Sequence, residues 1–332
     1  MCPLNTLPAH STMSATLERD LMTPTNDERL TAIIDTLRAI RPTALAETRV
    51  LCAGRVDEDA AWLREHGYLV EAIDEDGVRA QLITPPGPLD QGTLVAFHGG
   101  GFIVCSAATH AKAFGLMGAA SRLRVLNVDY RLAPEHRFPA AHDDCLRATR
   151  WAARALHRDV VLIGDSVGGN LSLSVGAQLI GEADVTVRGI VSISPLTDFT
   201  LSSPSLTTRR ARDPFTYCAG LPELRQMYLG EDEALARDPR ASPLFADVRG
   251  LAPTLVQMGS EEICYDDGLR MAERIHEAGG RVRFEEWQGM FHTWHHYAGA
   301  LSGADEAIGA VGAWVRDRTG VASDESESWL PC

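Results

Sequence analysis

A serine in a turn framed by glycines is the first feature of this sequence that could carry chemistry. In the stretch V-V-L-I-G-D-S-V-G-G-N-L-S, residues 160–172, an apolar β-branched run stops at Gly164 and a helical pattern resumes two residues past Ser166. The stretch therefore predicts a strand, a tight turn and a helix. The turn has the pattern G-x-S-x-G, in which glycines leave room for a strained backbone that pushes the serine hydroxyl outward. We predict Ser166 as a nucleophile, the alternative being a glycine-rich connection without chemistry.

A serine nucleophile needs a base and an orienting acid, which in a G-x-S-x-G hydrolase follow in the order serine, acid, histidine. His292 follows the last expected strand in the turn G-M-F-H, and we predict it as the base. Upstream, the expected strand 254–258 ends in G-S-E-E. We choose Glu262 as the acid because it falls in the turn, whereas Asp266 begins the next helix and is the second choice. Glu262 would hold the imidazole tautomer and stabilise the imidazolium.

The sequence H-G-G-G at residues 98–101 supplies the remaining catalytic part. Glycines at Gly100 and Gly101 allow backbone N–H groups to face a bound carbonyl oxygen, and the N–H of Val167 would join them. We expect His98 to hold the turn.

Strand and helix patterns alternate along most of the chain. We expect strands at 68–73, 78–83, 93–97, 125–128, 160–164, 189–193, 254–258 and 282–287. Helical spacing predicts helices at 30–40, 57–66, 109–122, 140–157, 266–278 and 304–318. This alternation predicts an α/β fold with a mostly parallel sheet that begins with an antiparallel hairpin. The expected site residues all fall at the carboxyl ends of strands, where open parallel sheets bind ligands.

Two kinds of segment interrupt this alternation. Residues 199–242 are polar, rich in arginine and punctuated by proline, so we interpret them as an insertion. The first twenty residues show no periodicity and predict a loose end, and the acidic tail predicts disorder.

Composition excludes several classes of partner. The net charge of −14 over 332 residues disfavours nucleic acid and anionic membranes, both of which are bound through basic patches. No run of eighteen apolar residues occurs, and the N-terminus lacks a basic and an apolar region of a secretion signal. The seven cysteines are widely spaced without C-x-x-C, which favours free thiols in a reducing compartment. We therefore expect a cytoplasmic protein.

Taken together, the motifs resemble those of the bacterial hormone-sensitive-lipase-like esterases, family IV of the α/β-hydrolase fold. H-G-G-G, Y-R-L-A-P-E, F-P-A-A-H-D-D, G-D-S-x-G-G-N, S-P-L-T-D and G-M-F-H occur in the family's order over residues 78–318. The sequence differs from the family pattern at two places. The acid is Glu262 rather than Asp, as in some members, and Val167 stands where the family usually has Ala, so its methyl groups could narrow the pocket.

The resemblance implies a mostly parallel eight-stranded sheet flanked by helices, with a helical cap over the site. It implies N-terminal cap helices within 1–66, the core in 67–198 and 243–320, and a cap insertion at 199–242. The acidic composition predicts the disordered tail at 321–332. It also implies serine carboxylesterase activity on short- to medium-chain or small-molecule esters through an acyl-enzyme, without a cofactor.

Further candidates for the site carry competing interpretations. We name as substrate-binding candidates Phe102, Asp165, Phe291 and Trp294, the alternative being core packing for the aromatic residues and hydrogen-bonded scaffolding for Asp165. A metal cluster of His292, His295 and His296 lacks the helix and acid that such spacing needs, so we expect no metal.

Alternative functions remain open at the level of sequence. The same mechanism would serve a lactone hydrolase or a pathway-specific deacylase, and the same fold hosts elimination and acyl transfer. A binding-only protein on this fold lacks the histidine, which is present here as His292. We expect a small-molecule ester as the partner, and pairing through the exposed last strand would give a homodimer.

Overall fold

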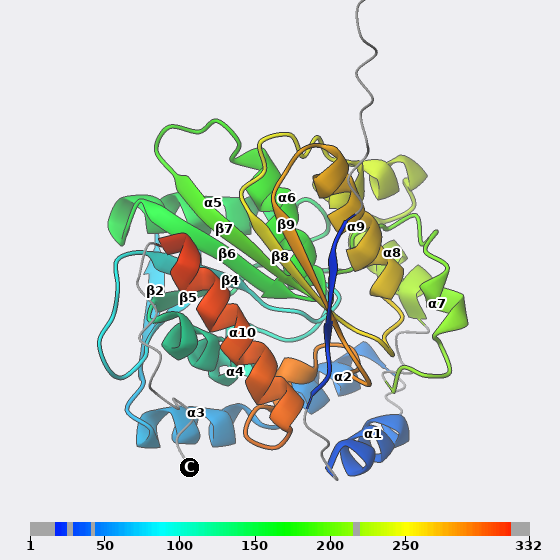
Figure 1. The fold of residues 1–332 in the computed structure, drawn as a ribbon, viewed down its shortest axis with the longest axis horizontal. Coiled ribbons are helices and arrows are strands. Elements are labelled where there is room, and N and C mark those ends of the chain that lie inside the picture. Colours follow the sequence, from blue (N-terminus) through cyan, green and yellow to red (C-terminus); the bar gives the residue numbers. More distant parts are fainter. Residues whose placement is uncertain (1–16, 25–28, 41–43, 215–219, 320–332) are drawn as a thin grey trace, which may run out of the picture.

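A nine-stranded sheet forms the centre of the computed structural model, which describes residues 17–24, 29–40, 44–214 and 220–319 (Figure 1). The strand order across the sheet is β1-β9-β8-β7-β6-β4-β5-β3-β2. The strands are β1 (Arg19–Met22), β2 (Leu69–Glu75), β3 (Val78–Thr84), β4 (Thr93–Phe97), β5 (Arg124–Val128), β6 (Asp159–Asp165), β7 (Thr186–Ile193), β8 (Thr254–Gly259) and β9 (Val282–Trp287).

The sheet is parallel except around β3, which pairs antiparallel with both of its neighbours. β2 pairs antiparallel with β3, and β3 pairs antiparallel with β5, whereas every other pair is parallel. This confirms the expected α/β fold with an antiparallel start. The strand that leads into Ser166, β6, lies between β4 and β7, so the nucleophile emerges near the middle of the sheet.

Helices cover both faces of the sheet, because successive side chains of a buried strand point to opposite sides. In β4, Val95 and Phe97 join the core cluster that includes residues of α5, α6 and α9, whereas Leu94 and Ala96 join the cluster that includes α4 and α10. Figure 1 shows α10 lying across the sheet. The α-helices are α1 (Arg29–Ala39), α2 (Leu45–Ala53), α3 (Val56–Glu65), α4 (Ala107–Ser121), α5 (Ala140–Ala155), α6 (Val167–Gln178), α7 (Ser205–Thr208), α8 (Leu221–Leu229), α9 (Tyr265–Glu277) and α10 (Ser302–Thr319).

The expected count of eight strands is wrong, because β1 adds a ninth beside β9. Its sequence, R-D-L-M, has no apolar alternation, and three of its four side chains are exposed. A short strand at the edge of a sheet can be polar on both faces, so periodicity gives no signal for it. Parallel pairing with β9 and an ion pair of 2.9 Å between Asp20 and Arg283 hold it in place. The last strand is therefore covered rather than exposed.

The N-terminal segment contains a helix that the sequence did not predict. α2 has only weak apolar periodicity and no fully buried residue, and it lies between the expected helices α1 and α3. The insertion 199–242 contains α7, α8 and the 3-10 helix η2 (Glu233–Arg237). The expected disordered tail, 321–332, lies outside the described residues. No helix in the described ranges is both long and apolar enough to cross a membrane.

Candidate active site

Ser166 stands at a sharp turn between β6 and α6, with a strained backbone at φ 56° and ψ −119°. Close packing at the flanking glycines makes this turn compact. A Cβ at Gly168 would lie 1.9 Å from the carbonyl oxygen of Phe97 in β4, and one at Gly164 would lie 2.2 Å from the carbonyl oxygen of Gly168. Only glycine fits at either position. The turn thus presents the serine hydroxyl at the carboxyl end of the central strand, as the G-x-S-x-G pattern predicts.

The three residues expected to form a catalytic triad are joined by hydrogen bonds. His292 Nε2 lies 3.0 Å from Ser166 Oγ, and His292 Nδ1 lies 2.8 Å from Glu262 Oε2. A carboxylate can only accept, so Nδ1 carries the proton and Nε2 is left to accept one from the serine hydroxyl. This geometry suits activation of a hydroxyl nucleophile by an imidazole base.

The neighbouring Glu262 carboxylate stabilises the protonated form of His292. Burial alone would lower the pKa of His292, but the hydrogen bond and the charge of Glu262 outweigh burial and raise it above 6.5. Glu262 is fully buried, and its other oxygen accepts hydrogen bonds from the Ser194 hydroxyl at 3.0 Å and from the Gly259 N–H. These donors fix the carboxylate against the imidazole.

The alternative acid, Asp266, makes a different contact. Its Oδ2 accepts a hydrogen bond of 2.7 Å from the backbone N–H of Ser205, at the start of α7. Asp266 therefore holds part of the insertion, and the carboxylate hydrogen-bonded to His292 belongs to Glu262.

The glycine loop that follows β4, residues 98–101, packs against the serine turn that follows β6. Gly100 has φ 109° and Gly101 has φ 62°, both in the region that favours glycine. His98 supports the loop: its Nδ1 donates to the carbonyl oxygen of Gly99 at 2.7 Å, and its ring stacks on Tyr130. Burial lowers the pKa of His98 to about 3, so its ring is neutral. Val167 begins α6, where the first backbone N–H groups have no partner within the helix.

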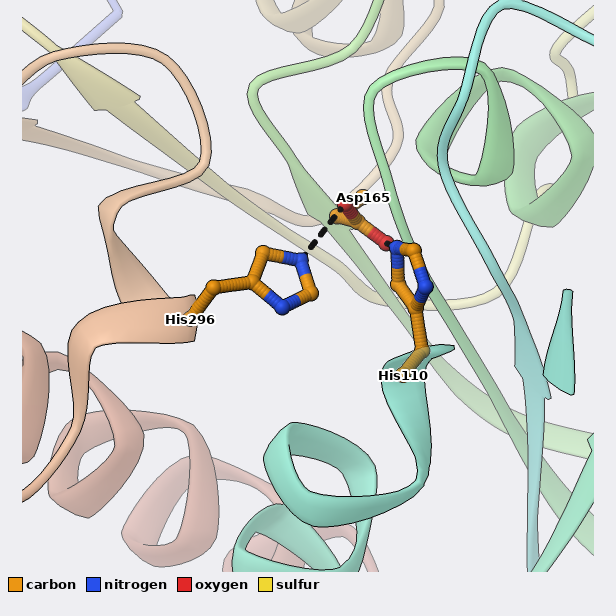
Figure 2. A group of neighbouring side chains, drawn as sticks. All are labelled: His110, Asp165 and His296. Atoms are coloured by element: carbon orange, nitrogen blue, oxygen red, sulfur yellow. Dashed lines mark hydrogen bonds and ion pairs between the residues drawn. The ribbon is translucent and has the colours of Figure 1, made fainter. Parts of the chain in front are cut away.

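Asp165, next to the nucleophile, lies at the centre of a buried polar network (Figure 2). Its carboxylate is 3.1 Å from His296 Nε2 and 3.4 Å from His110 Nε2, and it accepts a hydrogen bond of 3.0 Å from the N–H of Gly99. Burial would raise the pKa of Asp165, but the two histidines lower it well below its usual range. The network fastens the serine turn to the glycine loop. The sequence analysis did not name His110 and considered His296 only as a metal ligand, because their meeting point depends on contacts distant in the chain.

The same three side chains are the group of potential metal ligands found among the described residues, with ligand atoms within 4.8 Å of one another. The N–H of Gly99 points at this group, donating to both His110 Nε2 and Asp165 Oδ1. A donor aimed at the centre opposes a cation there. His292, His295 and His296, which the sequence places together, diverge toward Ser166, Gln257 and Asp165 respectively.

The aromatic residues suggested as substrate contacts are buried. Phe291 is in edge contact with Tyr297, and Trp294 packs on Trp287 and donates from Nε1 to a backbone carbonyl. Phe102 is also fully buried and stacks on Tyr228 of α8, with ring centroids 3.9 Å apart. Core packing accounts for these contacts.

A side chain of the insertion lies directly over the glycine loop. A Cβ at Gly101 would lie 2.4 Å from Leu224 Cδ1. This half-buried leucine of α8 therefore occupies the space that a side chain at Gly101 would need. Together with the stacking of Tyr228 on Phe102, this contact sets α8 against the residues that follow H-G-G-G. The sequence analysis missed Leu224, whose only signal is an apolar position within a polar insertion.

Comparison with known proteins agrees with this arrangement. The family described as alpha/beta hydrolase fold matches residues 94–296. An acetyl-hydrolase of Streptomyces hygroscopicus is 36% identical over 237 residues, covering 71% of this chain and 79% of that protein. An ethyl acetate hydrolase of Pseudomonas putida is 30% identical over 278 residues, covering 79% of this chain and 84% of that protein.

A solved structure matches over most of the chain. The crystal structure of an esterase from the bacterial hormone-sensitive lipase family superposes with a TM-score of 0.81 at 30% identity, covering 89% of this chain and all of that one. The chain therefore belongs to the α/β-hydrolase family, and within it to the esterases similar to hormone-sensitive lipase.

Proposed function

We propose that the chain hydrolyses small carboxylic esters with Ser166 as nucleophile, His292 as general base and acid, and Glu262 as orienting acid. The observation that carries the proposal is the continuous hydrogen-bonded path from Ser166 Oγ through His292 to the buried Glu262. Relatives named acetyl-hydrolase and ethyl acetate hydrolase support a small ester as substrate.

The mechanism follows from these positions. The Ser166 oxygen attacks the ester carbonyl carbon while His292 Nε2 takes its proton, and the oxyanion is stabilised by the backbone N–H groups of Gly100, Gly101 and Val167. His292 then gives the proton to the departing alkoxide, which leaves an acyl-enzyme on Ser166. A water molecule activated by His292 releases the acid. No step requires a cofactor.

The carbon chain of the substrate is limited by Leu224, which touches the glycine loop. A carbonyl oxygen held by that loop would bring one arm of the ester beneath α8. The location and assembly are also proposals. The four described cysteines form no disulfide with one another, which suits a cytoplasmic protein. A homodimer formed by sheet pairing would use the outer edge of β1.

A substrate panel tests this function. p-Nitrophenyl esters from acetate to decanoate, together with aliphatic esters and lactones, should show turnover that is highest for short acyl chains. Preference for lactones would favour the lactone hydrolase instead. Absence of turnover, with no labelling by a fluorophosphonate probe, would overturn the proposal in favour of ligand binding alone.

Replacing Leu224 by alanine should shift the preference toward longer chains. Removal of three carbons above Gly101 opens space, and one methylene in an apolar pocket is worth about 1–3 kcal/mol in discrimination. We expect the ratio of kcat/KM for hexanoate over acetate to rise about tenfold. Leu221→Ala, on the same helix, is the matched control and should leave this ratio unchanged. An equal ratio in both variants would show that Leu224 does not contact the substrate.

The pH dependence should show an acid limb whose midpoint lies above 6.5. The base form of His292 is required, so kcat/KM falls as pH decreases through its raised pKa. The measurement is kcat/KM for the free enzyme from pH 5 to 9, followed at the isosbestic wavelength of nitrophenol. A flat profile, or a midpoint below 6.5, contradicts the assignment of His292 as the base.

A further inference from the structure

The loop that carries the expected triad acid is held by side chains of the insertion. Glu262 lies between β8 and α9, and the next residue is Ile263. The N–H of Ile263 donates a hydrogen bond of 2.9 Å to Asp213 Oδ2, and its carbonyl oxygen accepts one of 2.6 Å from the Ser205 hydroxyl. Both backbone polar groups of Ile263 are therefore bound by the insertion. We call residues 205–213 the acid-loop clamp.

The acid-loop clamp also holds the residues that precede the triad acid. The guanidinium of Arg209 donates to the carbonyl oxygen of Ser260 and lies over the ring of Tyr265, 3.6 Å from the ring centroid. The guanidinium of Arg212 forms a two-point ion pair with Glu261, with both N–O distances at 2.6 Å. The clamp thus contacts the chain on both sides of the triad acid.

Asp213 differs from the other residues of the clamp because it is a buried carboxylate. It is 1% exposed, and no step of the proposed mechanism uses it. Withdrawing a carboxylate from water is costly unless hydrogen bonds or charges compensate. One compensating donor is the N–H of Ile263, which belongs to the peptide bond between Glu262 and Ile263. The charge of Asp213 therefore lies against the peptide unit that follows the triad acid.

We propose that Asp213 is a positioning residue of the triad: it anchors the peptide unit after Glu262 and places a second negative charge near the pair of Glu262 and His292. Hydrogen bonds to the Glu262 carboxylate hold the tip of that side chain, and the acid-loop clamp holds the backbone from which it extends. The position of Asp213 rests on its own contacts, whereas its effect on hydrolysis rests on the proposed function.

Three carboxylates act on the imidazole of the triad. Burial lowers the pKa of His292, and the hydrogen bond and charge of Glu262 raise it. The charges of Asp213 and Asp165 raise it further. The two guanidinium groups of the clamp are engaged with other acceptors. Removing the charge of Asp213 should therefore lower the pKa of His292, while Glu262 and Asp165 remain in place.

Two substitutions separate the hydrogen bond of Asp213 from its charge. Asp213→Asn keeps an oxygen that can accept from the N–H of Ile263 but removes the charge, whereas Asp213→Ala removes both. We expect kcat on the alkaline plateau to fall about threefold in Asp213→Asn and about 10- to 100-fold in Asp213→Ala, because a displacement of about 1 Å can cost about 10²-fold. KM should change less than kcat in both, since neither variant alters a substrate contact.

The pKa of His292 is a readout that a merely structural role would not move. In Asp213→Asn, the acid limb of kcat/KM should have its midpoint at lower pH than in the parent, because the base form of His292 persists as its pKa falls. Nuclear magnetic resonance of protein with ring-labelled histidine measures the same pKa without substrate. The resonance of His292 is assigned by its loss in His292→Asn, and its titration should move in the same direction.

Asp238→Asn is the matched control. Asp238 is another acid of the insertion whose carboxylate accepts a backbone N–H, that of Arg240 at 2.9 Å. Its replacement should leave both kcat and the titration of His292 at their parental values. Thermal unfolding of each variant shows whether a loss of kcat accompanies a loss of fold.

Two results would overturn the role of Asp213. One is a folded Asp213→Ala that keeps kcat within about twofold of the parent. The other is a His292 titration in Asp213→Asn that stays at the parental pH or rises, and this result decides the proposal even where Asp213→Ala does not fold. If the parent hydrolyses no ester, the proposed function fails, while the resonance titration of His292 still decides the placement of the Asp213 charge.

Discussion

Replacing Ser166 by alanine should reduce kcat on p-nitrophenyl acetate by roughly four to six orders of magnitude. The alanine methyl group offers no attacking oxygen, so no acyl-enzyme forms, and only binding and the oxyanion donors remain to assist water. The strained backbone at φ 56° is accessible to alanine at similar cost, so the fold should persist. KM should change little, because the hydroxyl contributes to the reaction more than to ground-state binding.

Matched measurements separate lost chemistry from lost structure. Ser174→Ala, on the same helix α6, removes a buried hydroxyl away from His292 and should leave kcat within about twofold of the parent. Both variants should unfold near the parental temperature, and only Ser166→Ala should escape labelling by a fluorophosphonate. Retention of more than about one hundredth of the parental kcat in Ser166→Ala would remove this residue from the mechanism.

Local sequence is sufficient to predict the parts of the site that lie on tight turns. Gly164 and Gly168 face backbone atoms at distances that no side chain permits. The presence of glycine at these positions therefore predicts the tight turn from the sequence alone. The strands that carry these turns are buried on both faces and have long apolar runs. The fold and the order of Ser166, Glu262 and His292 could therefore be predicted without coordinates.

Contacts that depend on chain distant in sequence were not predictable in this way. Leu224 touches Gly101 from an insertion whose path follows no periodic pattern, and Arg49 reaches the carbonyl oxygen of Ile103 from a helix with little apolar periodicity. β1 pairs with β9 at the edge of the sheet, without an apolar pattern of its own. In each case the residues look ordinary in the sequence, and only the fold gives them neighbours.

Glu262→Gln and Asp266→Asn together decide which acid belongs to the triad. In Glu262, one oxygen accepts from Ser194 and Gly259, so a glutamine should place its amide oxygen there and turn its NH₂ toward His292. Nδ1 must then accept that donor, which moves the imidazole proton to Nε2 and prevents Nε2 from taking the Ser166 proton. An equivalent exchange in a serine protease triad lowers kcat about 10⁴-fold, and we expect a loss of about 10³–10⁴-fold here.

Asp266→Asn serves as the control because the Asp266 carboxylate accepts a hydrogen bond from the Ser205 N–H, and an amide oxygen can still accept there. Its kcat should stay within about threefold of the parent. The pH profile adds a second readout: without the charge that raises the pKa of His292, residual activity in Glu262→Gln should persist to lower pH than in the parent. A large loss in Asp266→Asn beside an active Glu262→Gln would transfer the orienting role to Asp266, and the hydrogen bond between Glu262 and His292 would then have no catalytic part.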